Sequence, residues 1–179
     1  GETFEKYSTV PICDRIKGEE LTRAIQMVIF EDNKYKAYYV GGSSFIQGKT
    51  KEIPQYELRY MESPDGIHFP NEIGKVVIPV EKGCFRVGKP YIVKENGTYK
   101  MFYSDGADDE ALYKLAYAES TDGLNWTKKD LNLPYEENSW DSQMAEYPSF
   151  IRVNGKAYLF YNGNNYGYDG FGYAELIEE

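Results

Sequence analysis

Residues that could carry acid–base chemistry gather in one stretch of the sequence, WDSQMAEYP at 140–148. It contains two carboxyl groups, Asp141 and Glu146, and carboxyl side chains can donate or accept a proton during catalysis. Trp140 precedes Asp141, and an aromatic face beside a carboxylate is a common platform for a sugar ring. Glu146 and Asp141 are therefore candidate catalytic residues, and Trp140 is a candidate binding residue. The alternatives are a surface position for Glu146 and simple packing for Trp140.

Cationic side chains occur near the starts of two other expected strands, in LTRA and in RVGKP. Arg23, Arg86 and Lys89 could contact sugar hydroxyls or a substrate carboxylate or phosphate, or lower the pKa of a catalytic carboxyl group. Solvated charges at strand ends are the alternative. Three further polar residues could hydrogen-bond a ligand. Asp105 and Asn162 end aromatic-rich runs, in YSDG and YNGN, and Tyr166 lies in a glycine-rich loop.

Several kinds of active site are excluded by residue types. His68 is the only histidine, so a multi-histidine metal site cannot be built on this chain. Because His68 falls in an outer-strand turn, far from the other candidate residues, a Ser-His-Asp triad is excluded as well. No phosphate-binding glycine loop of the Walker or Rossmann kind occurs. We therefore expect no metal and no cofactor.

The chain is acidic, with a formal net charge of −9 at pH 7 and a pI near 4.8. A nucleic-acid binder needs a basic face to displace counterions, so no nucleic-acid partner is expected. No apolar run approaches the roughly 20 residues of a membrane span. Cys13 and Cys84 lack CxxC spacing and are expected to be reduced thiols. These features lead us to expect a soluble protein.

The elements that must position these residues are revealed by an internal repeat. Three stretches share an apolar run, a polar turn and an aromatic-rich run: 21–42, 87–106 and 145–164. Their aromatic anchors, Tyr38, Phe102 and Phe160, are 64 and 58 residues apart. A second set of matching segments follows at the same period: 56–63, 113–120 and 170–176. Such a period is typical of propellers and solenoids.

Each repeat reads as antiparallel strands. Asn154-Gly155 between two apolar runs is a strong hairpin signal, and Asn96-Gly97 and 31–34 occupy the same place. Third strands are expected at 56–61, 112–118 and 171–176, and a fourth short strand is expected to carry Phe69 or Trp126. The high aromatic content, 16%, also favours strands. The fold class is therefore all-β.

Four antiparallel strands in about 60 residues make one blade of a β-propeller. The expected units are the end of one blade (1–18), two complete blades (19–80 and 81–135) and a last blade (136–179). GETF at the N-terminus matches GIHF and GLNW in the later repeats, so the chain is expected to begin inside a blade. Because three blades do not close a ring, the open blade edges could support self-association.

The repeat pattern in VGKPYIVKENGTYKMFYSDG and YKLAYAESTDGLNW resembles the five-bladed β-propeller glycosidases, the arabinanase, levansucrase and invertase clan, and especially its uncharacterised bacterial members. The resemblance implies a longer protein of which this chain is the C-terminal three-fifths. Glu146-Tyr147-Pro148 looks like the Glu-x-Pro that carries the general acid in arabinanase-type members. The second carboxylate would then lie in blades outside this chain. A six-bladed sialidase is a remote alternative.

The most conspicuous acidic motif, in YMESPDGIHF and YAESTDGLNW, is expected to be structural. Asp65 and Asp122 can bond backbone N–H groups two residues on, and the following glycine can take a positive φ. Phe69 and Trp126 would pack between blades.

The functional expectation is a carbohydrate-binding, glycoside hydrolase-like propeller with a sugar site at the mouth of its channel. The fragment alone is expected to be inactive, because the second carboxylate would come from elsewhere. Two alternatives remain open: a non-catalytic carbohydrate-binding propeller and a protein-interaction scaffold.

Overall fold

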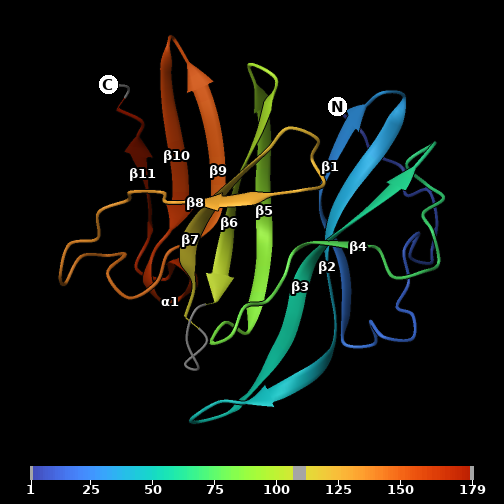
Figure 1. The fold of residues 1–179 in the computed structure, drawn as a ribbon, viewed down its shortest axis with the longest axis horizontal. Coiled ribbons are helices and arrows are strands. Elements are labelled where there is room, and N and C mark those ends of the chain that lie inside the picture. The colour runs from blue at the N-terminus through green and yellow to red at the C-terminus, as the bar shows by residue number, and fades with distance from the viewer. Residues whose placement is uncertain (1, 107–111, 178–179) are drawn as a thin grey trace.

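The computed structural model describes residues 2–106 and 112–177, so Gly1 of the GETF motif lies outside the described residues. The described chain is almost entirely β-structure, as predicted (Figure 1). Outside the strands, the short segment α1 (Asn164–Gly167) makes a single turn in which Asn165 and Tyr166 have left-handed backbone. No helix in this part of the chain is long and apolar enough to cross a membrane.

The strands form three antiparallel meanders that follow one another along the chain and lie side by side (Figure 1). The first meander contains β1 (Thr22–Glu31), β2 (Lys34–Gln47), β3 (Glu52–Ser63) and β4 (Lys75–Ile78). The second contains β5 (Arg86–Glu95), β6 (Thr98–Gly106), β7 (Lys114–Ser120) and β8 (Thr127–Lys129). The third contains β9 (Glu146–Val153), β10 (Lys156–Asn162) and β11 (Phe171–Glu175).

A single parallel pairing, Tyr56 with Arg86, joins the first two meanders into one sheet, whereas the third meander is a separate sheet. The fourth strands differ from the sequence prediction. Neither β4 nor β8 contains Phe69 or Trp126, because each strand begins after the aromatic residue. Residues 2–18 contain no strand.

Tight turns close the predicted hairpins. Asn96-Gly97 and Asn154-Gly155 have positive φ at both positions, as a type I′ turn requires. Asp32 and Asn33 adopt the same left-handed conformation between β1 and β2. The hairpin predictions are therefore confirmed.

Apolar side chains fill the space between successive meanders. Tyr38 and Tyr103 are fully buried between the first and second meanders. Phe102 of the second meander stacks on Phe150 of the third, with ring centroids 5.1 Å apart and planes 13° from parallel. Complete burial of one such side chain contributes roughly 1.5–3 kcal/mol. This packing fixes where the starts of β5 and β9 lie relative to each other.

The two Asp-Gly motifs form the same turn. Asp65 Oδ1 accepts hydrogen bonds from the backbone N–H groups of residues 67 and 68, and Asp122 Oδ1 accepts them from residues 124 and 125. These bonds hold the pKa of both carboxyl groups well below the usual range. Both carboxylates are thus engaged by their own turns, as the sequence predicted. Trp126 lies edge-on to Tyr38 between the first two meanders.

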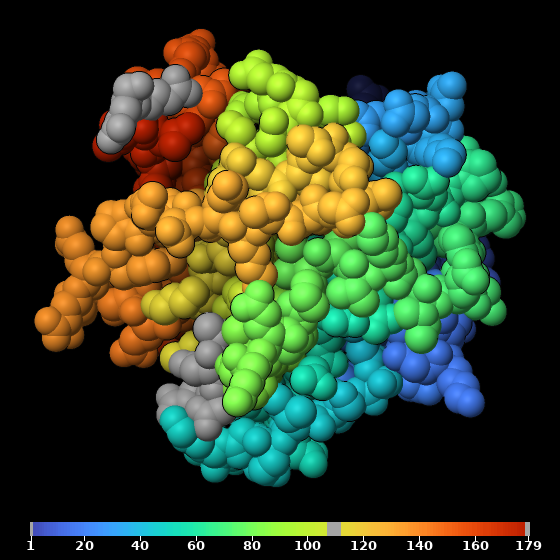
Figure 2. Space-filling model, in the orientation of Figure 1, coloured from blue at the N-terminus to red at the C-terminus, as the bar shows by residue number. Residues whose placement is uncertain are grey.

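The segment around β8 crosses the face of the molecule that is turned toward the viewer in Figure 2.

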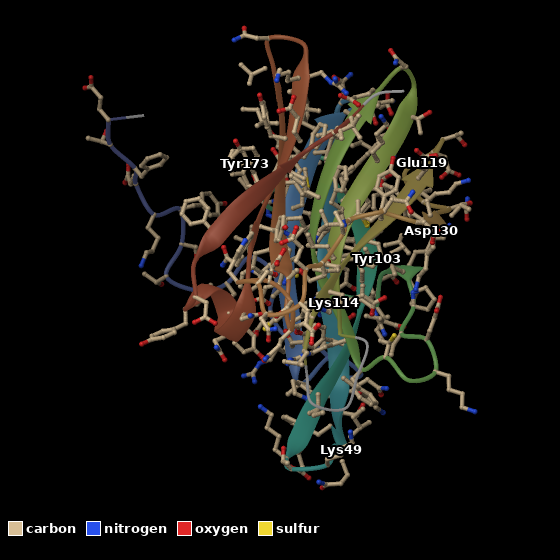
Figure 3. The ribbon with its side chains drawn as sticks, turned by 90° about the vertical axis from the view of Figure 1, so that its left-hand side faces the viewer. Lys49, Tyr103, Lys114, Glu119, Asp130 and Tyr173 are labelled. Carbon is tan, nitrogen blue, oxygen red and sulfur yellow. The ribbon has the colours of Figure 1, made fainter. Side chains whose placement is uncertain are left out.

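The outer face of the third meander is apolar and exposed. Ile151, Val153, Phe171 and Tyr173 are each at least 46% exposed. Tyr173 lies on the side of this sheet away from Tyr103 (Figure 3). The sheets of the described chain therefore do not close into a ring.

Candidate active site

The predicted site residues that come together lie where β5 and β9 begin. We call residues 86–90 the second entrance and residues 146–148 the third entrance. In each, one extra residue bulges from the strand, and the residue before proline is left-handed: Lys89 has φ 53° and Tyr147 has φ 56°. A residue before proline normally prefers extended backbone, and the left-handed region is unfavourable for any residue with a Cβ. Both entrances therefore hold strained backbone, which often marks functional sites.

Glu146 is the buried carboxyl group of the third entrance. Its side chain has no exposed surface, and neither carboxyl oxygen has a hydrogen-bond partner among the described residues. Burial raises the pKa of Glu146 to about 7, while the Tyr147 hydroxyl, Arg86 and Lys89 act in the opposite direction. A carboxyl group with this pKa carries a proton much of the time at neutral pH, so it can serve as a general acid.

Arg86 of the second entrance is buried among tyrosines. Its guanidinium carbon lies 4.4 Å from the centre of the Tyr113 ring, and its Nη2 donates a hydrogen bond of 3.2 Å to the Tyr166 hydroxyl. The Tyr113 hydroxyl is 2.5 Å from that of Tyr56, and burial raises the pKa of Tyr113. These rings fix the guanidinium in one orientation near Glu146.

Lys89 is the exposed cation of the site. Its backbone N–H donates to Gln26 Oε1, which holds the bulge in place from the first meander. Its ammonium group lies 5.2 Å from the centre of the Tyr147 ring. Within the described residues, no carboxylate lies within 4.0 Å of this ammonium group.

A hollow of about 290 Å³ adjoins this cluster in the first meander, at the lower end of the size of ligand pockets. Tyr56 lines the hollow and also contacts Tyr113, so it connects the hollow with the residues around Arg86. The other polar residues that line the hollow are Ser43, Ser44, Gln55, Glu57 and Arg59. The hollow could therefore hold a hydroxyl-rich ligand next to the cluster.

Asp141 and Trp140 are engaged within the third meander. Buried Asp141 accepts a hydrogen bond of 2.7 Å from the Tyr161 hydroxyl and another from the Ser139 hydroxyl. Trp140 stacks on Tyr161 at 5.0 Å between ring centroids. An added Cβ at Gly163 would come within 2.3 Å of the Trp140 backbone oxygen. These contacts hold the segment that leads into Glu146.

Arg23 lies in the first meander and makes its contacts there. It is buried, and its Nε is 2.9 Å from Glu19, which also accepts hydrogen bonds from Tyr39 and Arg59. The Arg23 guanidinium also donates to the backbone oxygens of Asp14, Pro70 and Glu72. None of these partners belongs to the second or third entrance.

Asp105 also lies apart from Glu146, beside Cys84 and 3.8 Å from the Lys128 ammonium group, and burial raises its pKa. Asn162 is paired with Glu146 across β9 and β10. Tyr166 is half-exposed and left-handed, with φ 60°. Of the predicted site residues, Glu146, Arg86, Lys89 and Tyr166 come together, and Asn162 lies beside Glu146 as its strand partner.

Three tyrosines of this cluster, Tyr56, Tyr113 and Tyr147, were not among the residues singled out in the sequence. A signal was present, because Tyr56 and Tyr113 begin the matching segments YELRY and YKLAY of two repeats. From the sequence, both segments are expected only as third strands. No group of three or more His, Cys, Asp or Glu residues able to hold a metal ion occurs in residues 2–106 and 112–177.

The sequence has a relative over nearly its full length. No protein-family model matches the chain. It is 31% identical over 178 residues to "Uncharacterized protein Rv1502" of Mycobacterium tuberculosis (strain ATCC 25618 / H37Rv), in a match that covers 98% of this chain and 58% of the relative. The chain thus spans a little over half the length of the curated relatives that it matches.

Solved structures with similar folds are glycoside hydrolases. Zg3597, a family 117 glycoside hydrolase of Zobellia galactanivorans, matches with a TM-score of 0.71 at 21% identity, over 95% of this chain and 56% of that one. A thermostable family-43 glycoside hydrolase matches with a TM-score of 0.68 at 19% identity, over 94% and 58%. The fold is that of the β-propeller glycoside hydrolases. The resemblance inferred from the repeats is confirmed at the level of the fold.

Proposed function

We propose that the protein acts on carbohydrate as a glycoside hydrolase-like β-propeller, with Glu146 as the general acid. The observation that carries this proposal is a fully buried carboxyl group without a hydrogen-bond partner among the described residues. A native protein rarely leaves such a group unpaired unless the group has a chemical task. The fold shared with glycoside hydrolases supports the same conclusion.

The proposed architecture is a five-bladed propeller of which this chain supplies about three blades. The first, second and third meanders would be the blades at 19–80, 81–135 and 136–179, and 1–18 would end a preceding blade. The chain covers 56% and 58% of two enzymes of similar fold, which is close to three-fifths. The exposed apolar face of β9–β11 is what a missing neighbouring blade would cover.

In the proposed reaction, Glu146 donates its proton to the glycosidic oxygen as the bond between that oxygen and the anomeric carbon breaks. The leaving sugar departs as a neutral alcohol. A second carboxylate must then stabilise or attack the anomeric carbon, or activate a water molecule. The groups that shift the pKa of Glu146 are Tyr147, Arg86 and Lys89, none of which is a carboxylate. We assign the second carboxylate to the blades outside this chain.

The test is Glu146→Gln in the intact protein, because glutamine keeps the shape and removes the proton. We expect kcat on an unactivated glycoside to fall by about 10²- to 10⁴-fold. The decrease should be smaller for an aryl glycoside whose phenol leaves without a proton. Glu137→Gln, at an exposed position, is the matched control. Full activity of the Glu146→Gln protein would refute the assignment.

A non-catalytic sugar-binding propeller is the second candidate, and it is favoured because none of the described groups that shift the pKa of Glu146 is a carboxylate. It predicts saccharide binding by the intact protein without release of any sugar. Turnover that depends on Glu146 would rule this candidate out.

A further inference from the structure

Another cavity, of about 430 Å³, lies in the second meander, and its volume is within the range of ligand pockets. We call it the β6–β8 cavity, since Tyr103 and Asp105 of β6 and Lys128 of β8 line it, together with Glu81 from the segment before β5. Lys128 and Glu81 form an ion pair of 2.7 Å, and Figure 2 shows the segments that carry them next to each other on the near face. None of the residues that line this cavity is among the groups that shift the pKa of Glu146, so it is separate from the candidate active site.

Two buried polar atoms of this cavity have no hydrogen-bond partner among the described residues, namely Tyr103 Oη and Asp105 Oδ1. Tyr103 is fully buried. The two residues are two positions apart on β6, so their side chains lie on the same face of the sheet. Native proteins leave few buried polar atoms unpaired, because each one costs free energy. Two such atoms at one cavity point to a ligand that supplies the missing hydrogen bonds.

The ligand must suit a phenol and a carboxyl group. Burial raises the pKa of Tyr103, so its hydroxyl keeps its proton and can donate it in a hydrogen bond. An alcohol hydroxyl can accept from the phenol and donate to the carboxyl group of Asp105, and it suits either protonation state of that group. An ammonium group could donate to Asp105 but could not accept from Tyr103. The Lys128 ammonium group already lies 3.8 Å from Asp105 Oδ2.

We propose that the β6–β8 cavity binds a hydroxyl-rich ligand, a polyol or a sugar unit. Tyr103 Oη donates to one ligand hydroxyl, and Asp105 Oδ1 accepts from the same hydroxyl or from its neighbour. The inference goes beyond the proposed function, because it does not depend on Glu146 or on any reaction there. Asp105 is also a residue that the sequence predicts to hydrogen-bond a ligand.

The test compares small probes that differ in their hydrogen-bonding groups, with binding followed by NMR of the isotope-labelled protein. Glycerol and D-glucose both donate and accept through hydroxyls, whereas dioxane only accepts and methylammonium only donates. We expect glycerol or glucose to shift the backbone amide signals of Tyr103, Asp105 and Ala116 in a saturable way. Dioxane and methylammonium should bind there about tenfold more weakly, because each leaves one of the two polar atoms unpaired.

Two variants remove the two polar atoms one at a time. Tyr103→Phe removes only the hydroxyl, and Asp105→Ala removes the carboxyl group. Each should weaken binding of the hydroxyl probe by about three- to tenfold, and if one variant fails to fold, the other decides. Tyr7→Phe removes a hydroxyl from a side chain that is 71% exposed, and it should leave the affinity unchanged. Glu146→Gln should leave the shifts at the cavity unchanged as well.

Three results overturn the inference. The first is that neither glycerol nor glucose gives saturable shifts at the cavity, and the second is that the folded variants of Tyr103 and Asp105 bind as tightly as the wild type. Either would mean that the cavity holds only water. The third is tighter binding of methylammonium than of both hydroxyl probes, which would identify a cation site. None of these results bears on the proposed function, which is tested separately through kcat of Glu146→Gln.

Discussion

The second entrance places Lys89 after Gly88, whereas the third entrance places Tyr147 after Glu146. The backbone is the same in both: a bulge, a left-handed residue and then a proline. Strand pairing makes Gly88 and Glu146 equivalent, since Gly88 is paired with Ser104 and Glu146 with Asn162. One repeated backbone therefore carries a cation in one place and a buried carboxyl group in the other.

The difference follows from the space next to each entrance. An added Cβ at Gly88 would lie 3.1 Å from Val40 Cγ1 and 3.2 Å from Gln26 Oε1, because the first meander packs closely there. The third entrance has room for a complete glutamate side chain and buries it fully. Packing between meanders thus determines which entrance can hold a buried carboxyl group.

The largest expected effect comes from Gly88→Glu, which would make the second entrance resemble the third. The new side chain must displace Val40 and Gln26 and bury a charge, so we expect the free energy of unfolding to fall by about 4 kcal/mol or more. Urea unfolding of the wild type and the variant measures this change.

Gly88→Ala separates the effect of overpacking from the effect of burying a charge, because alanine adds the Cβ without a charge. We expect a loss of about 1–3 kcal/mol from overpacking alone. If Gly88→Glu unfolds at the wild-type urea concentration, the entrances are interchangeable and the packing argument is wrong.

The second prediction concerns the pH dependence of stability. The pKa of Glu146 is about 7 in the fold against 4.5 for an ordinary glutamate, so the unfolded chain ionises this group first. The contribution of the neutral Glu146 side chain to the free energy of unfolding is therefore fully present below pH 4.5. It is lost as the pH rises through about 7. Each unit of pKa difference corresponds to about 1.4 kcal/mol, which gives a loss of up to about 3 kcal/mol.

Glu146→Gln has no such ionisation, so its stability relative to the wild type should rise by up to about 3 kcal/mol between pH 4.5 and 7.5. Urea unfolding at several pH values measures the difference. Glu137→Gln should show no comparable trend. A constant difference between Glu146→Gln and the wild type would mean that Glu146 is solvated, not buried.

The repeat made much of the fold predictable. Periodic apolar runs and the Asn-Gly turns identified the hairpins, because both depend on local sequence. The position of β4 was missed, since it pairs with β3 after an irregular segment that follows Phe69 and has no periodic pattern. The engagement of Arg23 by Glu19 was also beyond prediction, because it depends on how the segment before β1 folds over the first meander.

The smallest expected effect tests the strain that the entrances share. Lys89 has a left-handed backbone, which is unfavourable for a residue with a Cβ and acceptable for glycine. Lys89→Gly and Lys89→Ala remove the same lysine side chain, but only the glycine variant relieves the strain. We expect Lys89→Gly to be more stable than Lys89→Ala by about 1 kcal/mol in urea unfolding.

The control is the same pair of substitutions at Lys100, whose φ is not positive. There the alanine variant should be the more stable one, because glycine weakens a strand. Equal stability of the two Lys89 variants would show that the bulge relaxes, and that the entrance is not rigid enough to fix Lys89 over Tyr147.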